Sequence, residues 1–354
     1  MKWRLNGLLP LSLIFLFLSF GFHKSNDTSM GDKTCVVCDR LSLFETIMQK
    51  VGAKYWHSYN TKDMTPPPVY FDDSVSWLAF SNEVLFKNIK YERIKCASGL
   101  ILYKLNIRLD TVLFHMENKM SFTDATSPYY YHPIMFCSYV ETASRLIPEV
   151  KNTEEWLQMV LHEYFHAFQF NHKNSINYLA DSIALSVDSL HGYYRRNNWF
   201  RGYLKMENDY LLKAIDAQAE DSIKYFSAQF FETRKQRREQ FFTQFHFDIS
   251  RAEMFWEKIE GTARYIEYNT GFVYTKIKHK SLDKGCDLSF KGFKNYYDKD
   301  ITNEPWFYEK TQMMVGYYYV TGFNLCRLLD KLKISYKDNL FNTPSTELEQ
   351  YLCK

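Results

Sequence analysis

The hydrophobic pattern of the chain changes character near residue 150. Before this point, short apolar runs of strand-like composition alternate with polar segments and Pro-bearing turn signals. These runs are 101–107, 111–115 and 133–140. After it, apolar residues recur at helical spacing almost to the C-terminus. The change predicts an α+β fold that is predominantly helical, with a small N-terminal β-sheet in residues 25–150 and a mainly helical part in residues 151–354. Within the first part, the polar residues 25–40 are expected to form a flexible lead-in.

One predicted helix has a clear start and a clear apolar face. Asn152 followed by Glu155 is an N-cap with an acidic residue at the third helical position. The apolar residues behind it form a single stripe: Trp156, Leu157, Val160, Leu161, Tyr164, Phe165 and Phe168. His162 and His166 lie away from the centre line of the stripe. We therefore expect the two histidines to share a face of the helix that is not buried.

This pair of histidines indicates a metal site. Side chains four residues apart on a helix lie one above the other, with about 6 Å between their Cβ atoms, so that both imidazoles reach one ion. Neutral imidazoles suit Zn²⁺, and zinc lowers the pKa of its bound water to about 7. Glu163, beside His162, can accept a proton from that water and return it to a leaving group. The pattern predicts His162 and His166 as zinc ligands and Glu163 as the general base.

A third protein ligand is needed, and the sequence leaves three candidates. They are Glu260, His172 and Asp181. Glu260 stands on a second helical segment and is followed by Gly261, a small residue that lets helices approach closely. His172 has the third-ligand spacing of the long zinc signature, but Gln169 occupies the position where that signature needs Gly. Asp181 has no supporting pattern. We favour Glu260 and keep the other two as alternatives.

The two motif segments together resemble a known family. His162-Glu163-Tyr164-Phe165-His166, followed much later by Glu260-Gly261-Thr262-Ala263-Arg264-Tyr265, resembles the gluzincin branch of the zincin metallopeptidases. The resemblance covers a small part of the chain and makes residues 173–250 an insertion. It implies zinc bound by His162, His166 and Glu260, with Glu163 as general base. It also implies a zincin-like fold, with the active-site helix under a small sheet whose edge strand binds extended peptide.

No motif assigns an oxyanion-stabilising residue. Tyr265 and the run Tyr317-Tyr318-Tyr319 are chemically suitable, since a Tyr hydroxyl can donate to a developing oxyanion. Tyrosine is abundant in this chain, at 27 residues, and each of these side chains is interpreted first as core.

The N-terminus predicts export. A positive segment, 1–4, precedes an almost unbroken apolar run, 8–22, which has the length of a signal-peptide core and is short for a bilayer-spanning helix. Residues 1–24 are therefore predicted to be a signal peptide or an N-terminal membrane anchor. The absence of an Ala-x-Ala site leaves cleavage open. The expected location is the periplasm, the extracellular space or the outer face of a membrane.

Composition excludes several classes of function. A net charge of +3 is too small to indicate a nucleic acid or an anionic membrane as partner. No Gly-rich phosphate loop and no Gly-x-Ser-x-Gly elbow occurs, which disfavours nucleotide enzymes and serine hydrolases. The basic run 234–238 is interpreted as a solvated helix face.

The cysteines do not predict a disulfide framework. There are seven of them, an odd number, and they are widely spread along the chain. Cys35 and Cys38 form a C-x-x-C pair just after the export signal. We expect this pair to be a local disulfide or two free thiols.

The predicted function is an exported zinc-dependent metallohydrolase, in first place a peptidase acting on a peptide or protein. One alternative is a non-catalytic exported binding or surface protein that retains a zincin scaffold. Another is a membrane-anchored processing factor that acts on one partner. The sequence does not disclose cleavage preference, endo- or exopeptidase action, or oligomeric state.

Overall fold

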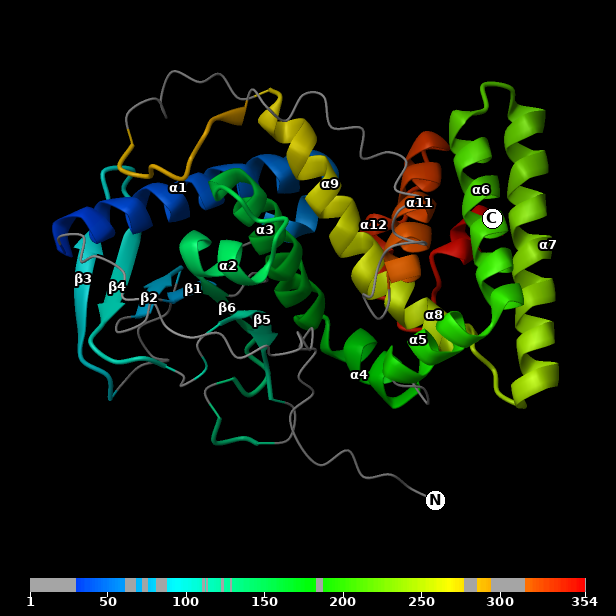
Figure 1. Cartoon of the computed structure of the whole chain (residues 1–354), viewed down its shortest axis with the longest axis horizontal. Coiled ribbons are helices and arrows are strands. Elements are labelled where there is room, and N and C mark those ends of the chain that lie inside the picture. Colours follow the sequence, from blue (N-terminus) through cyan, green and yellow to red (C-terminus); the bar gives the residue numbers. More distant parts are fainter. Residues whose placement is uncertain are drawn as a thin grey trace. The chain divides into compact units, whose positions relative to one another are not determined.

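The computed structural model (Figure 1) describes most of the chain after the predicted export signal. The described residues are 30–60, 68–71, 76–80, 88–109, 112, 114–121, 124–127, 129–182, 187–276, 285–293 and 316–353. The predicted signal peptide or anchor, 1–24, lies outside them. The chain divides into two compact units. Residues 1–171 and 269–298 form the first, and residues 172–268 and 299–354 form the second.

A mixed β-sheet of six strands belongs to the first unit. The strands are β1 (Pro68–Phe71), β2 (Ser76–Ala79), β3 (Tyr91–Lys95), β4 (Ile101–Leu105), β5 (Met116–Lys119) and β6 (Ile134–Ser138). Their order is β3-β4-β2-β1-β6-β5, and β1 pairs with β6 in parallel while the other neighbours are antiparallel. The predictions at 101–107 and 133–140 are confirmed by β4 and β6. The prediction at 111–115 is wrong for its described residues, because the strand there begins at Met116; residues 111 and 113 lie outside the description.

The sheet is covered most completely at its centre. Every residue of β1 and of β6 is buried, whereas the edge strand β3 is mostly exposed. One face has a core of Val69, Leu78, Leu105, Ile134 and Phe136. The other edge strand is β5, which contacts one of the helices of this unit, α3 (Thr153–Phe170). The sheet thus places an edge strand beside the helix that carries the histidine motif.

The helices of the first unit pack through aromatic rings. They are α1 (Met30–Tyr55), η1 (His57–Asn60), α2 (Val140–Leu146) and α3, and the last part of α9 (Thr262–Tyr274) also belongs to this unit. Trp56 and Tyr59 each lie edge-on to Phe165 of α3, with ring centroids 5.0 Å apart in both pairs. The apolar stripe predicted for α3 therefore faces these aromatic side chains. The expectation of a flexible lead-in at 25–40 is wrong from Met30 onward, because α1 begins there.

Two disulfides join α1 to distant parts of the first unit. Cys35 bonds to Cys286, and Cys38 bonds to Cys96. The expectation that Cys35 and Cys38 form a local pair or remain free is therefore wrong, and so is the expectation that the chain has no disulfide framework. The two cysteines lie three residues apart on one helix, and packing brings a different partner to each. Disulfides persist in oxidising compartments, which agrees with export.

The described part of the chain has no helix whose length and hydropathy would suit it to crossing a membrane.

The second unit is helical. Its further elements are α4 (Lys173–Ser182), α5 (Val187–Arg196), α6 (Asn198–Asp216), α7 (Glu220–Phe245), α8 (Ser250–Trp256), the π-helix η3 (Glu257–Gly261), α11 (Gly316–Lys331), α12 (Lys337–Leu340) and η6 (Glu349–Cys353). The long helices α6 and α7 lie side by side (Figure 1). Helix α11 packs against both α6 and η3. The predicted α+β class, mainly helical with a small sheet, is confirmed.

The basic run on α7 is solvated only in part: Lys235 and Gln236 are exposed, so the prediction is wrong for Arg234 and Arg237. Arg234 and Arg237 are fully buried, and they bind four acidic residues of the second unit. These are Glu207, Glu253, Glu257 and Glu349. The side of α7 that carries the two arginines faces these carboxylates, and their charges keep the pKa of each guanidinium well above its ordinary value despite burial. The sequence pattern of α7 could not indicate that these arginines are buried among acidic residues, because the four glutamates come from four other segments.

Candidate metal centre

The start of the motif helix is built as the sequence predicts. The Asn152 side chain accepts a hydrogen bond of 2.9 Å from the backbone N–H of Glu155. The Glu155 carboxylate in turn accepts from the backbone N–H of Lys151 at 2.8 Å. The first bond satisfies a backbone donor that the first turn of a helix leaves without a partner, and the second ties the residue before the cap to the same turn. The cap sets where the helix begins, and therefore which way each later side chain points.

The face that carries the motif is buried. His162, Glu163 and His166 are only 5%, 6% and 7% exposed, so the expectation of an unburied histidine face is wrong. Every residue from Val160 to Phe170 is buried. An apolar stripe identifies one covered side of a helix, but this segment is covered on all sides. Three polar side chains are thus held away from bulk water.

The two imidazoles lie next to each other, as their spacing predicts. The ring centroids of His162 and His166 are 4.9 Å apart, and the ring planes meet at 84°. The Nδ1 atom of His166 is 2.7 Å from Oε1 of Gln169. The backbone carbonyl of Glu163 accepts a hydrogen bond from the side-chain amide of Asn118 on β5. Both the second histidine and the acidic residue of the motif therefore have buried polar contacts.

Glu260 lies on the π-helical turn η3, between α8 and α9. Such single π-turns within helices are rare and are often found at functional sites. The side chain is 7% exposed. A ligand atom from each of His162, His166 and Glu260 lies within 4.8 Å of the other two. Of the candidate third ligands whose side chains the structure describes, Glu260 is the one grouped with the histidine pair.

Of the alternatives to Glu260, His172 lies elsewhere. The imidazole of His172 packs against the ring of Phe341, with centroids 5.4 Å apart, and it is not part of the metal-binding group. Asp181 lies on α4, and its side chain is outside the described residues.

The suggested oxyanion donors are packed in the interior. Tyr265 is buried, and its hydroxyl contacts the Asp330 carboxylate and accepts from Lys337 Nζ at 2.9 Å. The three tyrosines of the run 317–319 are also buried. Their burial agrees with the interpretation of these side chains as core.

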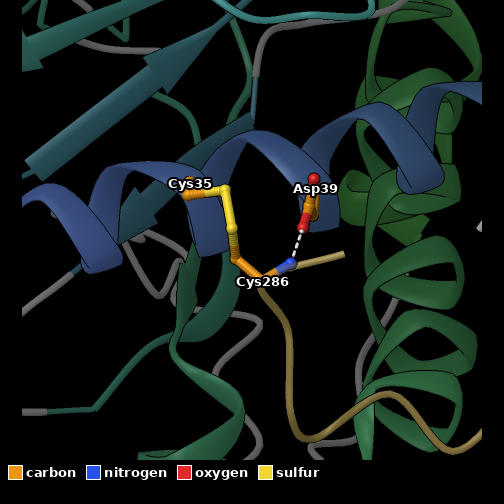
Figure 2. A group of neighbouring side chains, drawn as sticks. All are labelled: Cys35, Asp39 and Cys286. Carbon is orange, nitrogen blue, oxygen red and sulfur yellow. Dashed lines mark hydrogen bonds between the residues drawn. A yellow bond between two sulfur atoms is a disulfide. The ribbon is translucent and has the colours of Figure 1, made fainter. Parts of the chain in front are cut away.

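A second group of possible ligands, drawn in Figure 2, does not suit a metal. Cys35, Asp39 and Cys286 lie close together, but the two sulfur atoms form a disulfide. A disulfide offers no thiolate, which is the form of cysteine that binds metals. The Asp39 carboxylate accepts from the backbone N–H of Cys286 at 2.5 Å, so it holds the chain beside the disulfide. This group is structural.

The donor set of the first group fits a divalent ion. Two imidazoles and one carboxylate are ligands that zinc accepts, and three protein ligands leave a position open for water or substrate. Imidazole also suits copper, iron and nickel, so the residues alone do not select zinc.

No protein-family model, curated protein or solved structure matches the chain. The functional argument therefore depends on the chemistry of the site.

Two residues of the site were missed at the level of the sequence. Gln169 lies three residues after His166, a spacing at which helical side chains meet, so a search for polar neighbours of the histidines would have found it. Asn118 belongs to a strand 45 residues before Glu163, and no local pattern connects the two.

Proposed function

We propose that the chain is an exported metallohydrolase in which His162, His166 and Glu260 hold zinc and Glu163 acts as the general base. The observation that carries the proposal is the buried group of three ligand side chains, with ligand atoms within 4.8 Å of one another and with Glu163 next to His162 in the chain. Exclusion of water is typical of active sites, and the side chain of Glu163 is buried together with the three ligand side chains.

The role of each side chain follows from its chemistry. A zinc ion, when bound, lowers the pKa of a coordinated water to about 7 and polarises a carbonyl oxygen. Glu163 takes a proton from the attacking water and delivers it to the leaving nitrogen. His162, His166 and Glu260 fix where the attack occurs.

The proposed substrate is a peptide in extended form. Strand β5 lies at an edge of the sheet and contacts α3, so a peptide that pairs with this edge would lie along the helix of the motif. A zincin-like fold is part of this proposal. Export to the periplasm, the extracellular space or the outer face of a membrane is proposed from the N-terminal pattern, and the disulfides support it.

The test combines metal analysis with peptide cleavage. We expect the purified wild type to carry zinc, Glu260→Ala to lose it, and His172→Ala, the matched control, to retain it. We expect the wild type to cleave members of a peptide library, and Glu163→Gln to retain zinc but lose about 10²–10⁴-fold in rate. A wild type without metal, or a Glu163→Gln variant as active as the wild type, would overturn the proposal.

A different result would favour the non-catalytic alternative. Zinc bound by the three ligands without hydrolysis of any peptide pool would indicate a binding or surface protein on the same scaffold.

A further inference from the structure

The imidazole of His166 is enclosed by side chains of its own helix. His162, four residues earlier, lies edge-on to it at 4.9 Å. Phe170, four residues later, lies nearly parallel to it, with centroids 6.2 Å apart and planes at 16°. Gln169, three residues later, is fully buried and contacts Nδ1 through its amide oxygen at 2.7 Å. The ring is therefore restrained on two sides by rings and at one nitrogen by a polar atom.

The contact with Gln169 determines which ring nitrogen carries the proton. An amide oxygen only accepts hydrogen bonds, so at 2.7 Å the Nδ1 atom of His166 must be the donor. A neutral imidazole has one N–H, and its other nitrogen then carries the lone pair. That nitrogen is Nε2. The Nδ1–H tautomer leaves Nε2 as the atom that can bind a metal.

We propose that Gln169 is a positioning residue that holds His166 in the Nδ1–H tautomer with Nε2 presented to the metal. The metal-binding half of this inference rests on the proposed function, whereas the tautomer is a property of the metal-free chain. Metal-binding histidines commonly donate their second N–H to a carboxylate, carbonyl or water, and loss of that partner costs about 10–100-fold in metal affinity or activity. The side-chain amide of Gln169 fills this place.

A second substitution keeps the acceptor at position 169 and changes its charge. The carboxylate of Gln169→Glu would accept the same hydrogen bond from Nδ1 of His166. Gln169→Glu should therefore preserve metal binding, since it keeps the acceptor and increases the basicity of His166. A variant that offers no hydrogen-bond acceptor at position 169 should bind the metal more weakly.

The first experiment reads the tautomer without metal. In metal-free protein labelled with ¹⁵N-histidine, we expect the His166 signals to show a protonated Nδ1 and an unprotonated Nε2. Gln169→Leu should shift them toward the Nε2–H form, which predominates in free imidazole side chains. A wild-type His166 protonated on Nε2 would overturn the inference.

The second experiment measures zinc affinity by competition with a chromophoric chelator. Gln169→Leu should bind about 10–100-fold more weakly, and Gln169→Glu at least as tightly as the wild type. Gln158→Leu is the matched control, because Gln158 lies on the same helix outside the metal group, and its affinity should not change. Gln169→Met serves as a second variant if Leu disturbs folding, as checked by circular dichroism. Wild-type affinity in a folded Leu or Met variant would overturn the inference.

The two proposals fail in different ways. A wild type that binds no zinc refutes the proposed function, and the tautomer measurement still decides the contact with Gln169. A wild type that binds zinc and cleaves peptides, but whose affinity does not depend on residue 169, refutes only the role of Gln169.

Discussion

Asn118 on the edge strand β5 donates its side-chain amide to the backbone carbonyl of Glu163 on α3. Both residues are buried, and 45 positions separate them in the sequence. The bond ties the strand to the helix at the residue proposed as general base. It is a direct polar link between the sheet and the motif.

Asn118→Ala should weaken this link. Removal of a buried hydrogen-bond partner costs about 1–2 kcal/mol, and the free energy of unfolding should fall by that amount in urea denaturation. Asn106→Ala changes an exposed residue just after β4 and should have little effect. Equal stability of the two variants would show that the contact with Glu163 contributes nothing.

Gly322 of α11 and Gly261 of η3 let two helices meet at their backbones. A Cβ atom at Gly322 would lie 2.5 Å from the carbonyl oxygen of Glu257 and 2.8 Å from Cα of Gly261. Gly322→Ala should therefore destabilise the chain by about 1–3 kcal/mol through overpacking. It should also weaken metal binding, because the turn it displaces carries Glu260.

Gly202→Ala provides the matched control for this prediction. Gly202 lies within α6, and a Cβ atom there meets nothing within 4 Å. Alanine should stabilise the helix by about 0.5–1 kcal/mol. Thermal unfolding of the two variants should shift in opposite directions, and a shift in the same direction would contradict the close approach.

The buried arginines of α7 should be essential for stability. Arg237→Met leaves Glu207 and Glu253 buried with fewer cationic partners, and breaking a buried ion pair from one side costs about 3–5 kcal/mol. Lys235→Met, two residues earlier on the exposed face, should change stability by less than about 0.5 kcal/mol. Chemical denaturation gives the free energy of unfolding of both variants. Equal values would contradict the burial of Arg237 among carboxylates.

The disulfide pairing has a direct test. Trypsin cannot separate Cys35 from Cys38, so in a non-reducing digest their shared peptide should be linked to both the Cys96 peptide and the Cys286 peptide. Cys35→Ser should free Cys286 and leave the link to Cys96. Release of the shared peptide alone, with its own internal disulfide, would refute this pairing. Loss of either disulfide should cost about 2–5 kcal/mol.

Glu154 should make stability depend on pH. It is buried in the first turn of α3, and burial raises the pKa of its carboxyl from 4.5 to about 7, although the backbone N–H of Lys291 donates to it at 2.8 Å. Between about pH 4.5 and 7 the folded chain binds more protons at this site than the unfolded chain does. The contribution of Glu154 to stability is therefore lost as the pH rises through this range.

Glu154→Gln keeps an acceptor for Lys291 and removes the charge. The melting temperature of this variant relative to wild type should rise between pH 5 and pH 8. Glu149→Gln, at an exposed position shortly before α3, should show no such trend. A constant difference for Glu154→Gln across the range would mean that its carboxyl titrates normally.

Local spacing was sufficient for several features of the fold and of the candidate site. Asn152 and Glu155 predicted the start of α3, and the composition of 101–107 and 133–140 predicted β4 and β6. The interval of four residues predicted that His162 and His166 are neighbours. Each of these features depends on backbone geometry within a few residues, so the order of the side chains alone determines it.

Tertiary packing decided the rest. Segments far away in the chain bury the histidine face. They also determine that Arg234 and Arg237 meet carboxylates and not solvent, and that Cys35 bonds to Cys286. A helical pattern identifies the side chains that share a face, but it holds no information about what packs on that face. Burial, ion pairing and disulfide exchange are settled by whichever distant groups come within a few ångströms, and only the folded chain determines these.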